Sequence, residues 1–132
     1  MTVPPAVVEE LAQGRAYGFD LPDPSALEWV MVRTPASMPA LRLIHDLGPG
    51  ETEVLALALE TPDSMVILDD ALAGQVAETL EIPLRGTLGL LLDAKSAGLV
   101  AEIRPLLDQL QALRFRLSSH TRNAVLELAA ET

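Results

Sequence analysis

The sequence predicts an α/β fold with a mainly parallel sheet, and three observations lead to this prediction. Short apolar segments alternate with longer segments that carry helix end signals, which is the pattern of strands joined by crossover helices. The chain has 132 residues, 49% hydrophobic and 3% aromatic, so we expect one compact domain, residues 1–132, with an aliphatic core. Two carboxylates, Asp69 and Asp70, follow the apolar segment "MVIL", and ligand sites of parallel sheets gather at such strand ends.

The first half of the chain is predicted to form two helices and one strand. The segment "VPPAVVEELAQG" indicates a helix with prolines in its first turn and its end at Gly14. A strand of about five residues is expected within 27–35, where the chain reaches Thr-Pro. After a brief helical turn at 40–48, a helix is predicted at 48–60, with Pro49 near its first position. The Ala and Leu residues of this second helix predict substantial burial.

The second half of the chain continues the alternation and then becomes helical. Apolar segments predict two strands, and Gly, Pro and Ser residues mark the ends of the helices between and after them. The predicted strands are 65–68 and 82–84, and the predicted helices are 70–81, 86–98, 103–113 and a last one that Ser118 or Ser119 caps. The sequence therefore predicts three strands in all.

Composition excludes several classes of protein. No apolar run approaches the roughly 18 residues that a membrane span requires, and the N-terminal segment lacks the features of a secretory signal. The absence of cysteine excludes disulfides and thiolate metal sites. We therefore expect a cytoplasmic protein. A net charge of -10 opposes non-specific binding to nucleic acid, so contact with RNA would require local basic residues or bound metal ions.

Acidic residues at two predicted element ends are the candidates for chemistry. Glu51 lies at the start of a predicted helix, and Asp69 and Asp70 lie at the end of a predicted strand. One interpretation is structural, in which Glu51 complements the helix dipole and the aspartates cap the next helix. The other is a cluster of oxygen ligands for Mg²⁺ or Mn²⁺, which generates a hydroxide nucleophile and stabilises a phosphodiester transition state. Residue spacing leaves both interpretations open.

Two residues beside the third predicted strand are candidates for binding nucleic acid. Arg85 and Thr87 follow the segment "IPL" and have side chains that bind phosphate. The alternative is that both are ordinary surface residues.

Four segments in order resemble one family. They are "VPPAVVEEL", "LGPGETEVLALALE", "VILDDALAGQVAETLEIPLRGTLGLLLDAKSAGLV" and "IRPLLDQLQALRFRLS", and together they are similar to PIN-domain-like proteins, in the short predicted nucleic-acid-binding branch near the VapC-type toxins. The resemblance implies a three-layer ribonuclease fold that depends on Mg²⁺ or Mn²⁺ and cuts RNA, with an antitoxin protein as a partner in the toxin case. It further implies that Glu51 and Asp70 are catalytic and that Asp69 joins them as metal ligands.

The sequence also departs from that family's pattern. Members normally open with a central strand that ends in Asp, upstream of the segment that matches "VPP", so the resemblance describes an N-terminally truncated, incomplete PIN-like domain. Leu72 stands where relatives have a further acid, and Leu72 and Gly74 stand where they often have arginines. A catalytically inactive binding module is therefore the alternative function. An open sheet edge also predicts a homo-oligomer, most simply a two-fold dimer in which the partner covers that edge.

Overall fold

The computed structural model describes residues 1–38 and 46–132. Contacts divide the chain into two compact units, residues 1–85 and residues 86–132, and each unit is described by itself. The helical turn predicted at 40–48 lies largely outside the described residues. No helix in the described part of the chain is both long and apolar enough to cross a membrane.

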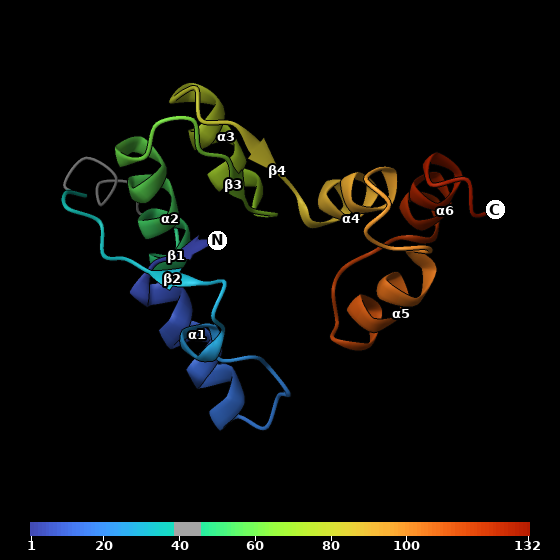
Figure 1. Ribbon diagram of the computed structural model, residues 1–132, viewed down its shortest axis with the longest axis horizontal. Helices are drawn as coiled ribbons and strands as arrows, with labels where there is room; N and C mark the ends of the chain where they lie inside the picture. The colour runs from blue at the N-terminus through green and yellow to red at the C-terminus, as the bar shows by residue number, and fades with distance from the viewer. Residues whose placement is uncertain (39–45) are drawn as a thin grey trace. The chain divides into compact units, whose positions relative to one another are not determined.

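The first unit contains two pairs of short parallel strands with helices between them (Figure 1). Its elements are β1 (Thr2–Val3), α1 (Pro5–Ala16), the 3₁₀ turn η1 (Pro24–Ala26), β2 (Met31–Val32), α2 (Pro49–Glu60), β3 (Val66–Ile67), α3 (Ala71–Thr79) and β4 (Leu84–Arg85). Strand β1 pairs with β2, and β3 pairs with β4. In each pair a helix lies in the connection between the strands, as parallel pairing requires. The α/β class with parallel strands is therefore confirmed.

Three details of the first unit differ from the predictions. Strand β1 precedes the first helix, although the sequence predicted no strand there. Helix α1 continues through Gly14 to Ala16, and the chain turns at Gly18, whose φ is 94°. Strand β2 has two residues, Met31 and Val32, rather than about five. In each case the hydrogen bonds of the backbone set the bounds of the element. A pattern of side chains in the sequence does not show those hydrogen bonds.

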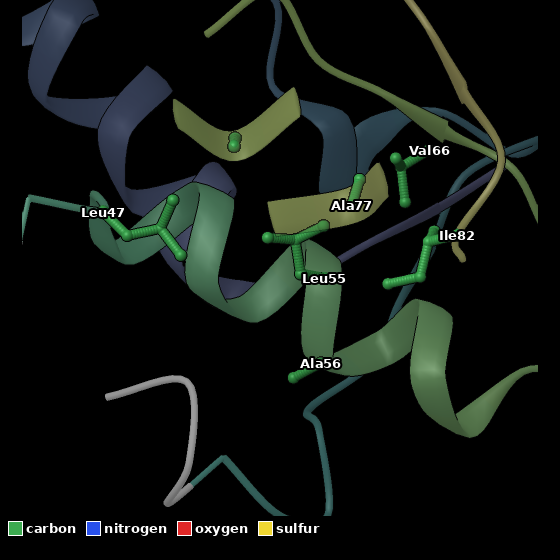
Figure 2. Close-up of a cluster of buried hydrophobic side chains, with 7 residues drawn as sticks. Leu47, Leu55, Ala56, Val66, Ala77 and Ile82 are labelled. Carbon is green, nitrogen blue, oxygen red and sulfur yellow. The ribbon is translucent and has the colours of Figure 1, made fainter. Parts of the chain in front are cut away.

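The core of the first unit joins α2, α3 and β3. Its buried residues are Leu47, Leu55, Ala56, Val66, Ala73, Ala77 and Ile82. Figure 2 shows the Leu55 side chain directed toward Ala77, with Val66 and Ile82 beside them. The predicted burial of α2 is confirmed, since Leu55 is 0% and Ala56 1% exposed. Small alanines on α3 let the two helices approach closely.

The second unit consists of three helices around a separate core. They are α4 (Thr87–Ser96), α5 (Arg104–Ala112) and α6 (Ser119–Leu128), and the buried residues are Ile103, Leu107, Val125, Leu126 and Ala129. The Ser118 side chain accepts a hydrogen bond of 3.1 Å from the Thr121 backbone N–H. This confirms the predicted serine cap of the last helix.

Among the described residues, five of the six α-helices end with the chain in the left-handed region. Glycine takes this position at Gly18 and Gly98, whereas Glu81, Arg114 and Ala130 take it after α3, α5 and α6 with φ between 57° and 68°. The following N–H then bonds back into the helix, as from Ile82 to Ala77 O at 2.8 Å and from Glu131 to Leu126 O at 2.8 Å. These are the bonds of the Schellman motif.

The Glu131 carboxylate connects all three helices of the second unit. It accepts hydrogen bonds from the Lys95 ammonium at 2.9 Å, from the Ile103 N–H at 2.9 Å and from the Arg104 N–H at 3.1 Å. The bond from Ile103, with the bonds from Lys95 and Arg104, lowers the pKa of Glu131 to about 2. The charged form of Glu131 therefore holds α4, the start of α5 and the segment after α6 together.

The low pKa of Glu131 predicts that acid destabilises the second unit. The folded-state pKa is about 2 against an ordinary value of 4.5, so the contribution is fully present above the ordinary value and declines as the pH falls between the two. We expect Glu131→Gln to lower the thermal midpoint at neutral pH and to differ progressively less from wild type toward pH 2. Circular dichroism melts across this range would check it. A constant difference would contradict the assignment.

Candidate acidic site at the ends of β1 and β3

Asp69 and Asp70 follow β3 with only Leu68 between, close to the predicted position, and both residues are exposed. Asp70 is the N-cap of α3, and its Oδ2 accepts a hydrogen bond of 2.9 Å from the Ala73 N–H. The capping interpretation is therefore confirmed for Asp70. This bond occupies one carboxylate oxygen, so it leaves the other available to a second partner.

Glu51 lies in the first turn of α2. Counted from the N-cap Gly48, it is the third helical residue, from which a glutamate reaches back toward the N-cap in a capping box. The Glu51 Oε2 lies too close to Gly48 to leave room for a Cβ there, so the carboxylate folds back over the helix end. The side chain is half-buried. It therefore combines access to solvent with the favourable end of the helix dipole.

Helices α1 and α2 each place a carboxylate at the start of the other helix. The Glu10 Oε1 accepts a hydrogen bond of 3.0 Å from the Gly50 N–H, and the Glu53 Oε1 accepts one of 3.4 Å from the Ala6 N–H. Glu53 thus faces α1, and only Glu51 faces the site, as their helical spacing requires. No pattern in the sequence indicated Glu10. The one feature of the sequence that relates to this contact is Gly50, because the absence of a side chain there leaves room for a carboxylate from another helix.

A cavity of about 650 Å³, here called the β1–β3 cavity, lies beside the carboxylates of Glu10 and Glu51. Residues of β1, α2 and β3 line it, and their side chains are mainly aliphatic. Among the described residues of its lining, the ionisable side chains are Glu10 and Glu51. Its volume falls within the range of small-ligand sites.

The carboxylates have the chemistry of a site for a hard divalent cation, since Mg²⁺ and Mn²⁺ take oxygen ligands and retain water. Across residues 1–38 and 46–132, no three or more His, Cys, Asp and Glu side chains are grouped closely enough to hold a metal ion. The metal site of Glu51, Asp69 and Asp70 therefore stays a prediction.

The two predicted phosphate-binding residues lie on either side of the boundary between the units. Arg85 ends β4 in the first unit, and Thr87 begins α4 in the second. Both side chains are half-buried. Their contact with nucleic acid stays a prediction.

Two pairs of parallel strands, with Asp69 and Asp70 after β3, define an α/β protein whose candidate site lies at the carboxyl end of that strand. A family model described as a PIN domain matches residues 1–131. The chain belongs to this PIN-domain family, and the predicted family is confirmed. No curated protein and no solved structure matches the chain.

Proposed function

We propose that this protein is a PIN-like endoribonuclease that depends on Mg²⁺ or Mn²⁺ and acts in the cytoplasm as a toxin-like enzyme. The observation that carries the proposal is the position of Asp69 and Asp70 at the end of β3 in a chain of the PIN-domain family. A toxin of this kind would have an antitoxin protein as a partner.

Glu51, Asp69 and Asp70 would hold the cation in this proposal. The bound cation would supply a water of lowered pKa and positive charge to stabilise the phosphodiester transition state. Asp70 has a carboxylate oxygen beyond the one that accepts from Ala73. Glu51 would turn its flexible carboxylate from Gly48 toward the strand ends. Asp69 adds charge at the same strand end.

The charge distribution supports the second unit as the part that meets RNA. Residues 1–85 contain fourteen acidic and four basic side chains, whereas residues 86–132 contain five of each. Arg114 and Arg116 are exposed on either side of Phe115, and within the described residues neither has an ion pair. Basic and aromatic side chains together suit single-stranded RNA. Arg85 and Thr87 would add phosphate contacts.

Two substitutions of Asp70 separate catalysis from capping. Asparagine caps helices as well as aspartate does, so Asp70→Asn should keep the thermal midpoint while it removes the metal-dependent cleavage of a labelled RNA. Asp70→Ala should lose the cleavage and also about 0.5–2 kcal/mol of stability. Cleavage assays with Mg²⁺ or Mn²⁺ and paired melts measure both effects. Full cleavage by Asp70→Asn would contradict the proposal.

The alternative function is a catalytically inactive PIN-like domain that acts as an oligomeric binding module. The observation that favours it is the exposure of large apolar side chains in and just before β2, where Trp29 is 64%, Met31 62% and Val32 42% exposed. Exposed aromatic and aliphatic side chains on a strand edge favour pairing with a second chain. We propose that a homodimer forms at this edge.

Proline at the β2 edge tests the homodimer. The Met31 and Arg33 N–H groups bond to β1, so the Val32 N–H points to the outer edge. Val32→Pro should therefore convert a dimer of twice 14.1 kDa into a monomer without loss of fold. Light scattering of both proteins at micromolar concentration measures this. A wild-type monomer would contradict the dimer.

A further inference from the structure

The longest stretch of the sequence without an acidic residue, 109–126, lies in the second unit. It covers the end of α5, the turn at 113–118 and most of α6, and it contains three arginines and one histidine. Asp108 and Glu127 flank it. The whole chain has a net charge of -10, so this stretch supplies the local positive charge that an acidic protein requires to attract phosphate groups.

The three arginines of this stretch differ in their contacts. Arg122 donates to the Gln111 Oε1 and to the Asp108 Oδ1, both at 2.7 Å, so its charge serves to hold α6 to α5. Arg114 and Arg116 are exposed. Within residues 1–38 and 46–132, neither of these two side chains has an ion pair or a hydrogen bond. Their guanidinium groups are therefore available to a ligand.

The turn at 113–118, here called the basic turn, is fixed on both sides by hydrogen bonds. The Gln111 Nε2 donates to the Leu117 carbonyl at 3.3 Å, and the Phe115 N–H donates to the Leu110 carbonyl at 2.9 Å. Through Gln111 the basic turn is thus bonded to α5, and α5 in turn to α6. A turn held in this way loses little backbone freedom when a ligand binds, which favours affinity.

The fold itself does not require an arginine at the start of the basic turn. Arg114 has the left-handed backbone conformation, with a φ of 68°, which glycine adopts at lower cost than a residue with a Cβ. Residues held in unfavourable conformations gather at binding sites. The exposed guanidinium of Arg114 is therefore better explained by a ligand than by the stability of the second unit.

Polar and aromatic side chains adjoin the two arginines. Phe115 lies between them in the sequence and is half-buried, and His120 and Asn123 of α6 are exposed. Residues three apart are neighbours on a helix surface, so His120 and Asn123 lie together one turn into α6. Aromatic and imidazole rings stack on unpaired bases, and a side-chain amide bonds to base edges.

We propose that the basic turn and the exposed side of α6 form a binding face for unpaired RNA. The two arginines of the turn bind phosphate groups, the rings of Phe115 and His120 stack on bases, and Asn123 bonds to a base edge. The choice of RNA as ligand rests on the proposed function. The binding itself requires no divalent cation and none of the acids of the first unit, so it can be measured apart from cleavage.

The test measures binding of the full chain to a fluorescein-labelled single-stranded RNA of mixed sequence, about ten nucleotides long. Fluorescence anisotropy in the presence of EDTA should show saturable binding. The same RNA as a duplex should bind at least about fivefold more weakly, because its bases are paired and stacked. A strand of equal length without bases should also bind at least about fivefold more weakly, because stacking is lost.

Arg114→Gly separates ligand binding from a structural role. Glycine suits the left-handed conformation, so the substitution should keep or raise the thermal midpoint while RNA binding weakens. Together with Arg116→Gln it should weaken binding at least about tenfold and lower the slope of log K against log salt by about 1.4, since each phosphate contact on a single strand contributes about 0.7. Arg33→Gln removes an equal charge from an exposed position of the first unit and should leave binding within about twofold of wild type.

Asn123→Ala tests the contact with bases. It should weaken binding of the RNA strand at least about threefold and leave binding of the strand without bases unchanged, because only the base contact is removed. Glu127→Gln is the matched control on α6, since this residue is also exposed and its substitution removes no group that binds RNA. It should not weaken binding of either strand.

Three results would overturn the binding face. They are the absence of saturable binding in EDTA, equal binding of the single strand, the duplex and the strand without bases, and equal losses for Arg33→Gln and for the double variant at 114 and 116. The nuclease proposal fails separately. Binding at this face without metal-dependent cleavage would keep the face and reject the nuclease, whereas cleavage at unchanged affinity by the double variant would reject the face and keep the nuclease.

Discussion

Glu51→Gln should reduce the proposed Mg²⁺-dependent cleavage of RNA by about a hundredfold or more. The substitution keeps the size of the side chain and removes the charge that would hold the cation, and a bound metal contributes several kcal/mol to the transition state. The substitution should leave the fold intact, because glutamine also serves at the third helical position of a capping box, which Glu51 takes in α2. Rates measured at saturating Mg²⁺ and over a Mg²⁺ titration would check this prediction.

Glu53→Gln is the matched control for Glu51→Gln. Both residues belong to the first turn and a half of α2, yet the Glu53 carboxylate accepts from the Ala6 N–H of α1. Its substitution should leave cleavage within about twofold of wild type, since only a long hydrogen bond weakens. Equal losses for both variants would show that the effect comes from the helix pair and not from metal binding.

Leu55→Ala should cost about 2–5 kcal/mol of the free energy of unfolding of the first unit. The side chain is 0% exposed and lies at the centre of the core that α2, α3 and β3 share (Figure 2). Its neighbours Ala73 and Ala77 are too small to fill the space that the substitution leaves. Urea denaturation followed by circular dichroism measures the loss.

Leu59→Ala makes the corresponding change one turn further along the same helix, next to its last residue Glu60. This side chain is 54% exposed, so the substitution should change the free energy of unfolding by no more than about 0.5 kcal/mol. Similar losses at positions 55 and 59 would mean that the difference in burial between the two side chains does not determine the cost.

The sequence predicted those parts of the fold that local chemistry determines. Helix α2 begins at the predicted Pro49 and ends at Glu60, and Ser118 and Asp70 cap helices through their side chains. The strand after α2 was also correct in place and in its parallel pairing. Strand β1 was missed, because Thr2 and Val3 form a strand only through pairing with Met31 and Val32, far along the chain.

The sequence predicted where Asp69 and Asp70 lie in the fold, and it predicted the geometry around them only in part. The position of Asp69 and Asp70 follows from the end of β3, which side-chain patterning shows. The contact of Glu10 with Gly50 depends on how α1 packs on α2, and no local pattern in either helix encodes that packing. The β1–β3 cavity depends on the arrangement of two strand pairs, so it could not be predicted from either pair alone.

The left-handed residues after α3, α5 and α6 leave room for this protein to become more stable. A residue with a Cβ pays roughly 1–2 kcal/mol in that conformation, and glycine avoids the cost but loses about 0.5–1 kcal/mol of chain entropy. At Ala130, with φ 58°, replacement by glycine would remove only a methyl group. The chain thus holds a reserve of stability at positions outside the candidate site, on which destabilising changes at that site could draw during evolution.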